Sequence, residues 1–278
     1  MIARFISAIC AIPVILIAVW AGDLVLAILI GIIAGLAILE FYNLLKLRGI
    51  QPAVVIGFSW TLGFIFVGQH LPEMVIWMAI AGPLVILVWY QVRFVTSVVI
   101  SGIGPHNWPS ELKRILIDWI CTCAGAYYIG WTMALMLILR NEPMGLYWIL
   151  IVIFGTFATD TGAFATGRLL GRTLMVPRIS PRKTWEGAAG GMVFGTACSA
   201  LMVLLMPITI SLILAVLLGI LVSLGAQIGD LLESALKRSS GVKDSGNIIP
   251  GHGGILDRSD SVVLVIVAVY CFSRWMLN

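Results

Sequence analysis

Apolar residues occupy this chain in long runs, and the polar positions gather in short segments between them. Nine runs approach the roughly 20 residues that an α-helix needs to cross a bilayer. The stretch 94–105, after the fourth run, is compatible with an interfacial or re-entrant piece, which leaves the span count open by one. The pattern therefore predicts an all-α, polytopic transmembrane protein of about nine spans. The expected spans are 4–22, 24–45, 52–68, 74–92, 115–139, 145–167, 187–206, 208–229 and 261–277.

Composition supports the membrane assignment. Hydrophobic residues make up 60% of the 278 positions and charged residues only 11%, and the mean hydropathy is +1.07. These values exclude an ordinary soluble domain. The first apolar run resembles a signal peptide, but its length and the lack of a small-residue cleavage site favour a retained helix. Five cysteines without a CxxC pair provide no disulfide framework or zinc site, so we expect them to be buried small hydrophobes.

The basic residues are distributed unevenly between the two ends of the predicted spans. With the N-terminus in the cytoplasm, 15 of the 17 Lys and Arg residues face that side, and only Arg140 and Arg274 face the other. Positive residues collect on the cytoplasmic side of membrane proteins. We therefore expect a cytoplasmic N-terminus, with the two long charged segments, 168–186 and 230–260, also cytoplasmic.

The segment 230–260 carries five acids and four bases. If all nine met lipid at about 3 kcal/mol each, the cost of about 27 kcal/mol would exceed the net stability of a typical domain. The segment must therefore lie in water or line a polar cavity. In a helix that continues through Asp230, the side chains of Glu233, Ser234 and Lys237 share its face. Asp257 and Asp260 stand at the start of the last apolar run, where simple helix capping remains an alternative.

This balance of charge suggests a metal ion. The segment has a net charge of −1, which cannot hold a polyphosphate by charge alone, and Mg²⁺ prefers carboxylate and phosphate oxygens. Asp230 and Asp257 are the predicted ligands, and a second cation is left open. Lys237, Arg238, Lys243 and Arg258 would then contact phosphates directly. A solvated loop whose charges pair with each other is the alternative.

The segment 168–186 has five bases and one acid, so it would attract an anion. Asp160 lies about 12 Å before Arg168 along a helix, and a carboxylate within a span is a candidate functional residue. The stretch 180–187, SPRKTWEG, suits either a helix N-cap or a substrate contact. Membrane topology and anionic lipids offer a simpler explanation for the bases. The row Gly187, Gly191 and Gly195 predicts close helix packing.

Motifs in both segments resemble a known family. Residues 234–260, SALKRSSGVKDSGNIIPGHGGILDRSD, have the spacing of the CDP-diacylglycerol synthases, or phosphatidate cytidylyltransferases, and DTGAFATGRLLGR and ISPRKTWEG are similar to a second block of that family. The N-terminal half resembles it in architecture only. Ser259 departs from the family pattern, which has an apolar residue or Thr there, but this removes no charged group.

The resemblance implies that CTP and phosphatidic acid react to give CDP-diacylglycerol and pyrophosphate at the cytoplasmic face of a bacterial plasma (inner) membrane. It implies no nucleic-acid partner and leaves a homodimer open. Together with the charge and spacing of the two segments, the resemblance implies that the catalytic residues are Asp230, Lys237, Arg238, Asp257, Arg258 and Asp260. The predicted substrate-binding residues are Asp160, Arg178, Ser180, Lys183, Thr184, Glu186, Glu233, Ser234, Lys243, Asp244, His252, Gly253 and Gly254.

Two alternatives come from other classes of protein. A CTP-dependent lipid kinase of the polyprenol type would use the same nucleotide at a membrane but transfer its γ-phosphate. An ion-coupled transporter would use carboxylates midway along helices, although the inverted repeats typical of transporters are not visible. We divide the chain into N-terminal helices over 1–114, about four in number, and a catalytic region over 115–278 with about five.

Overall fold

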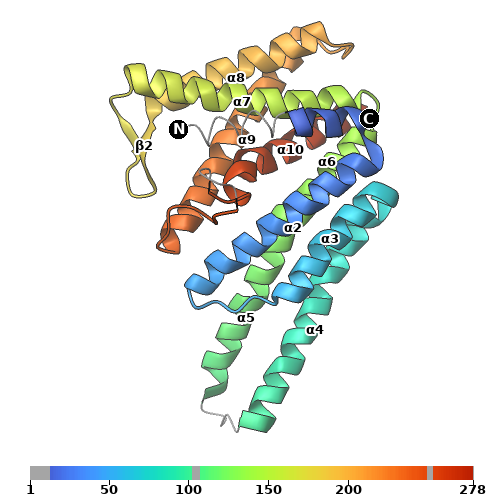
Figure 1. The fold of residues 1–278 in the computed structure, drawn as a ribbon, viewed down its shortest axis with the longest axis vertical. Coiled ribbons are helices and arrows are strands. Elements are labelled where there is room, and N and C mark those ends of the chain that lie inside the picture. Colours follow the sequence, from blue (N-terminus) through green and yellow to red (C-terminus); the bar gives the residue numbers. More distant parts are fainter. Residues whose placement is uncertain (1–12, 102–106, 249–252, 278) are drawn as a thin grey trace.

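The computed structural model describes residues 13–101, 107–248 and 253–277, and these are almost entirely helical (Figure 1). Two short strands form an antiparallel hairpin between two long helices. The elements are α2 (Asp23–Leu47), α3 (Val54–His70), η1 (Pro72–Met74), α4 (Val75–Ser101), α5 (Trp108–Gly125), η3 (Ala126–Trp131), α6 (Thr132–Asn141), α7 (Gly145–Leu170), β1 (Leu174–Val176), β2 (Ser180–Thr184), α8 (Trp185–Leu205), α9 (Leu212–Ser239) and α10 (Leu256–Leu277).

Seven helices among the described residues are long and apolar enough to cross a membrane. The 17-residue α3 is apolar but shorter than these seven. The first expected span, 4–22, lies mostly outside the described residues. All-α architecture and a polytopic arrangement of apolar helices are thus confirmed.

Two helices extend beyond the apolar runs that predicted them. The described part of the stretch 94–105, residues 94–101, belongs to α4 and forms no separate piece. The helix α9 runs to Ser239, ten residues past the apolar run 208–229, as the shared face of Asp230, Glu233 and Lys237 predicted. Helical hydrogen bonding needs no apolar side chains, so a helix can continue beyond the membrane into a polar segment. The proposed division at residue 114 falls inside α5.

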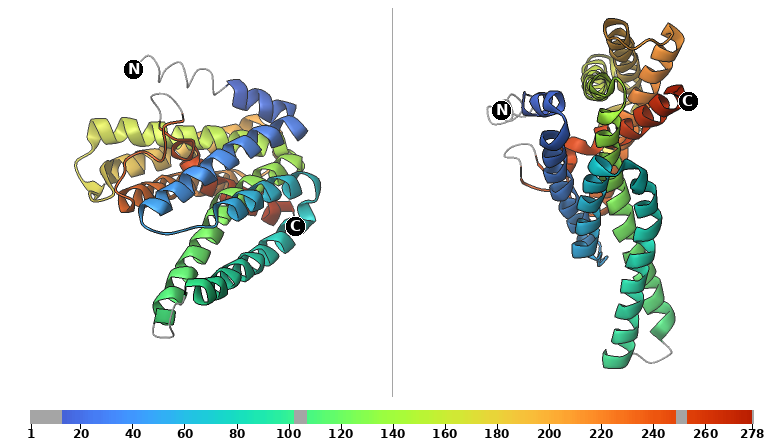
Figure 2. Two further views of the ribbon diagram at one scale, coloured as in Figure 1. Left: turned by 60° about the horizontal axis from the view of Figure 1, so that its bottom comes forward. Right: turned by 90° about the vertical axis from the view of Figure 1, so that its right-hand side faces the viewer.

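The helices form two groups (Figures 1 and 2). In the first, α7 packs along α8, and α9 packs against both α8 and α10. In the second, α2, α3, α4 and α5 run obliquely to that layer, and the ends of α4 and α5 extend away from the rest of the molecule. The end of α5, with η3 and α6, is largely buried and joins the groups. The loop between α9 and α10, at the end of the first group, contacts α2.

Glycines allow α8 to approach α7 closely, as the row at 187, 191 and 195 predicted. A Cβ atom at Gly195 would lie 2.0 Å from Thr159 Oγ1, and one at Gly191 would lie 2.9 Å from the Thr159 carbonyl oxygen. Real Cβ contacts are not that short, so larger residues would push the helices apart. This packing holds the hairpin between α7 and α8 at the end of the helix pair.

The four cysteines among the described residues are all free thiols. Cys123 is buried, and Cys121 and Cys198 are half-buried. The expectation of burial was wrong for Cys271, which is exposed on α10. An apolar side chain on the lipid-facing side of a helix is covered by lipid rather than by protein. Apolar neighbours in the sequence therefore do not predict that a cysteine is buried inside the protein.

Candidate functional site

The C-terminal turns of α9 present one polar face. The helix continues through Asp230, as the spacing predicted. Ser234 Oγ donates a hydrogen bond to Asp230 Oδ1 at 3.3 Å, and Lys237 Nζ forms an ion pair with Glu233 Oε2 at 2.7 Å. Glu233 is only 1% exposed. A buried carboxylate needs a charged partner, and Lys237 provides it.

Lys237 also connects α9 to the start of α10. Its Nζ lies 2.5 Å from Asp257 Oδ1. The other oxygen, Asp257 Oδ2, accepts hydrogen bonds from the backbone N–H groups of Ser245 at 2.9 Å and Gly254 at 2.8 Å. Asp257 thus closes the loop between the two helices. Both of its oxygens already have donors in this arrangement, so a metal ion there would have to displace Lys237.

The two charged segments, which lie far apart in the sequence, meet at α9. Lys183 Nζ on β2 forms an ion pair with Asp230 Oδ2 at 2.7 Å. Close by, Arg238 Nε donates to the backbone carbonyl oxygen of Ile179 at 3.2 Å. These contacts attach the basic hairpin to the acidic face of α9. Basic and acidic side chains from both segments therefore share one end of the molecule.

More carboxylates surround Asp230. Asp160 on α7 interacts electrostatically with Asp230, Asp260 and Lys183, and Asp260 on α10 interacts with Glu233. Asp260 is buried, whereas Asp160 is exposed and Asp230 half-buried. Negative charge gathered in one region favours a nearby cation or the protonated form of a carboxyl group. No group of three or more His, Cys, Asp or Glu side chains is close enough to hold a metal within the described parts of the chain.

Two of the predicted substrate contacts hold the hairpin in place. Thr184 is the N-cap of α8, and its Oγ1 accepts a hydrogen bond from Gly187 N at 3.1 Å. Glu186 accepts hydrogen bonds from the backbone N–H groups of Arg172 and Thr173, each at 3.2 Å. The capping alternative raised by the sequence therefore accounts for Thr184, whereas Glu186 ties the start of α8 to the segment that follows α7.

The remaining predicted residues are more accessible. Arg178, Lys243, Asp244 and Arg258 are exposed, whereas Ser180 is half-buried. Gly253 has a φ of 86°, which favours glycine. His252 lies outside the described residues. The departure at Ser259 is accommodated within α10, because its Oγ donates to the carbonyl oxygens of Ile255 and Leu256.

Comparison with known proteins identifies the family of the chain. The model of the family described as "Cytidylyltransferase family" matches residues 2–276. The chain belongs to this family. A Staphylococcus aureus (strain COL) protein named phosphatidate cytidylyltransferase is 33% identical over 265 residues, 95% of each chain. A Bacillus subtilis (strain 168) protein of the same name is 42% identical over 146 residues, 52% of this chain and 54% of that protein. A Staphylococcus saprophyticus protein of this name is 41% identical over 139 residues, 50% of this chain and 53% of its own length.

Two polar residues near the cytidylyltransferase motif were missed by the sequence analysis. Glu40 on α2 is buried and accepts hydrogen bonds from Ser245, Ile255 and Leu256. Tyr128 lies in the π-helix η3, and its buried hydroxyl has no hydrogen-bond partner among the described residues. A lone glutamate within the apolar run 24–45 was a usable signal for Glu40, because charges within spans are costly. The sequence offered no comparable signal for Tyr128.

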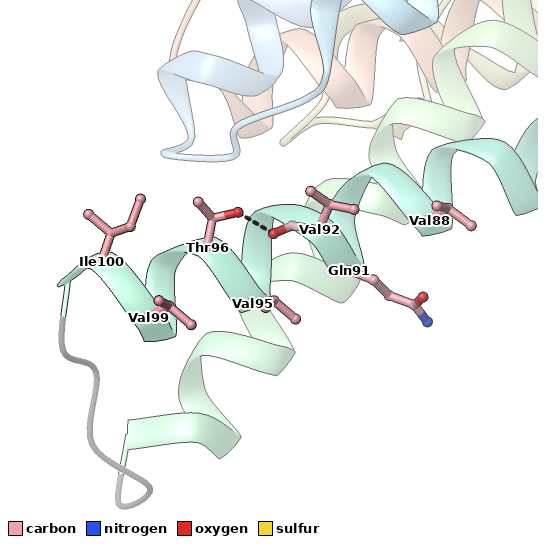
Figure 3. Close-up of a pocket in the computed structure, with 7 residues that line it drawn as sticks. All are labelled: Val88, Gln91, Val92, Val95, Thr96, Val99 and Ile100. Atoms are coloured by element: carbon pink, nitrogen blue, oxygen red, sulfur yellow. Dashed lines mark hydrogen bonds between the residues drawn. The ribbon is translucent and has the colours of Figure 1, made fainter.

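A shallow surface groove along α4 is not a second candidate for nucleotide binding (Figure 3). It contains no charged side chain, and Thr96 Oγ1 donates its hydrogen bond within the helix, to the Val92 carbonyl oxygen. Such a surface suits acyl chains rather than phosphates. The residues that line it are Val88, Gln91, Val92, Val95, Thr96, Val99 and Ile100.

Proposed function

We propose that this chain is a CTP:phosphatidate cytidylyltransferase, which condenses CTP and phosphatidic acid to CDP-diacylglycerol and pyrophosphate. The observation that carries the proposal is the Lys183–Asp230 ion pair, which joins the basic hairpin to the acidic motif. The family of the chain and the shared name of its relatives support the same reaction. The exposed arginine side chains of the hairpin suit the phosphates of the nucleotide and the lipid, and the carboxylates suit a divalent cation.

The proposed reaction forms one P–O bond and breaks another. A phosphate oxygen of phosphatidic acid attacks the α-phosphorus of CTP, and the bond from that phosphorus to the bridging oxygen of the β-phosphate breaks. Pyrophosphate leaves with the electron pair. A phosphomonoester with a second pKa of about 6 is already largely a dianion at neutral pH, so no strong general base is needed. The protein brings two anions together and neutralises the leaving group.

Magnesium remains part of the proposal. Asp230 is half-buried, and negative charge from Asp160 and Asp260 acts on the same region; a metal ion there would have to displace Lys183 from Oδ2. At Asp257 a metal ion would have to displace Lys237, while the backbone N–H groups of Ser245 and Gly254 hold the other oxygen. A bound magnesium ion would neutralise negative charge that develops on the phosphates. Lys183, Arg178 and Arg238 lie on the hairpin side, from which they can orient the nucleotide.

The decisive experiment is turnover by the purified chain in detergent, with CTP and phosphatidic acid, with and without Mg²⁺. CTP labelled at the α-phosphate should give labelled CDP-diacylglycerol and unlabelled pyrophosphate. With the same label, a lipid kinase would instead leave the label in CDP, because it transfers the unlabelled γ-phosphate to the lipid. Turnover without any ion gradient would exclude a transporter. If the wild-type chain consumes no CTP with phosphatidic acid present, the proposal fails.

We further propose nine spans with a cytoplasmic N-terminus, and a site that faces the cytoplasm of a bacterial plasma membrane. The two bases assigned to the opposite side, Arg140 and Arg274, lie at the same end of the molecule, which supports this orientation. Arg274 forms an ion pair at 2.9 Å with Glu142, which is two residues after Arg140. Single cysteines at Ser180 and Ser240, in a cysteine-free background, should resist an impermeant thiol reagent in intact cells and react in inside-out vesicles. A cysteine at Asn278 should behave oppositely. Labelling of Ser180 and Ser240 from opposite faces would refute a shared site.

A further inference from the structure

Glu40 is a buried acidic residue in a helix that is otherwise apolar around it. It lies on α2, in the N-terminal group of helices, and it is 4% exposed. Burial of a carboxylate is costly unless donors compensate it. The compensating donors should therefore reveal what the residue does.

The donors all belong to the cytidylyltransferase motif. Glu40 Oε1 accepts from Ile255 N at 3.1 Å, and Oε2 accepts from Leu256 N at 2.9 Å and from Ser245 Oγ at 3.0 Å. The first N–H groups of a helix lack partners within it and favour negative charge. Glu40 thus caps α10 from a position 216 residues earlier in the chain.

Two glycines of the motif are explained by the same carboxylate. A Cβ atom at Gly246 would lie 2.4 Å from Glu40 Oε1, and one at Gly254 would lie 2.3 Å from Glu40 Oε2. Neither has a positive φ. Gly246 is therefore needed because the loop packs against Glu40, and Gly254 because it packs against both Glu40 and Ser245, whose Oγ would lie 2.1 Å from its Cβ.

The contacts continue from Glu40 to the charged groups of the site. Ser245 Oγ lies 3.0 Å from Glu40 Oε2 and also 3.0 Å from Asp257 Oδ2, and its single hydrogen can serve one carboxylate at a time. Asp257 Oδ1 in turn contacts Lys237. A shift of Glu40 would therefore move Ser245, Asp257 and the ammonium group of Lys237.

We propose that Glu40 is a positioning residue for the cytidylyltransferase site. It fixes the first turn of α10 and the loop before it, and so sets where Asp257 and Lys237 meet the substrates. This inference rests on the proposed function. It also makes the N-terminal helices part of the active site rather than only a membrane anchor.

The test compares two amide substitutions of buried carboxylates. Glu40→Gln keeps one acceptor oxygen but places an NH₂ group against backbone donors. Asp118→Asn is the matched control, because Asp118 is 1% exposed and accepts a hydrogen bond from Gln51 N at 2.7 Å. Within the described residues, its carboxylate has no hydrogen bond or ion pair with a motif residue. The measurements are kcat per folded protein, KM for CTP and the thermal unfolding midpoint in detergent.

We expect Glu40→Gln to lower kcat about tenfold to 10²-fold, since small misplacement of reacting groups has effects of that size. KM for CTP should change much less. Asp118→Asn should lower the unfolding midpoint and leave kcat within about twofold. A folded Glu40→Gln protein with wild-type kcat would overturn the inference, as would an equal loss of kcat in Asp118→Asn.

A second pair of variants protects the test against a failure to fold. Gly246→Ala should lower kcat, because its Cβ displaces Glu40, whose Oε1, Cδ and Cγ are the three nearest atoms. In the Glu40→Ala background, which removes those atoms, Gly246→Ala should have little further effect. Additive losses in the double variant would contradict the proposed contact.

A final readout does not depend on activity. The amide hydrogens of Ile255 and Leu256 should exchange with deuterium faster in Glu40→Gln than in the wild type or in Asp118→Asn. If wild-type protein lacks turnover but shows this difference, the proposed function fails while the contact stands. If exchange is unchanged, the positioning inference fails whatever the reaction.

Discussion

The hairpin segment 168–186 and the motif segment 230–260 use their charges in different ways. In the hairpin segment, the side chains of Arg172, Arg178 and Arg182 are exposed and have no ion pair among the described residues. In the motif segment, Lys237 is held between Glu233 and Asp257. An incoming phosphate can approach the hairpin arginines without breaking a contact, whereas Lys237 would have to leave a carboxylate. The hairpin is therefore suited to attract anions and the motif to position them.

Asp230 joins the two segments, so its neutralisation should have the largest effect. We expect Asp230→Asn to lower kcat about 10²-fold or more, because both the ion pair with Lys183 and the predicted metal ligand are weakened. Turnover should be measured over a range of Mg²⁺ concentrations, with Asp257→Asn beside it. Wild-type rates for Asp230→Asn at saturating Mg²⁺ would remove Asp230 from the site.

Replacement of Lys237 should reveal the buried part of the network. Lys237→Met leaves Glu233, with a fully buried side chain, without its ion-pair partner. We expect the free energy of unfolding in detergent to fall by about 3 kcal/mol, as for other broken buried pairs. The double variant Lys237→Met, Glu233→Gln should recover stability but not turnover. A single variant as stable as wild type would mean that Glu233 is already neutral.

Arg258 tests geometry against charge within the motif segment. Arg258→Ala should lower kcat/KM about tenfold or more, because a charge-assisted contact is lost. Arg258→Lys should retain part of the activity, since it keeps the charge but not the planar fork. Equal kcat/KM for the alanine variant and wild type would assign Arg258 a structural role.

The hairpin arginines should show the smallest effects. Exposed charges contribute little individually, so Arg178→Ala or Arg182→Ala should raise KM for CTP by about fivefold at most, with kcat unchanged. The salt dependence of KM should weaken in both variants, because screening acts on the charge removed. If either variant instead lost kcat, the hairpin would position the reacting groups and the contrast between the segments would disappear.

The sequence alone determined the helical membrane architecture and the chemistry of the two charged segments. Helix length, apolar runs and the i, i+3, i+4, i+7 spacing are local properties, so Asp230, Glu233, Ser234 and Lys237 could be placed on one helix. The motif spacing also led to the family. Local patterns could not, however, show where α9 ends, because a helix can continue through polar residues.

Only the tertiary structure decided which distant residues meet. It paired Lys183 with Asp230, and it brought Glu40 to the backbone N–H of Leu256, 216 positions away. It also assigned Thr184 and Glu186 to the support of the hairpin. A carboxylate that accepts backbone N–H bonds makes no demand on the side chains of its partners, so such a contact leaves no pattern in the sequence. Packing of α2 against α10 alone creates it.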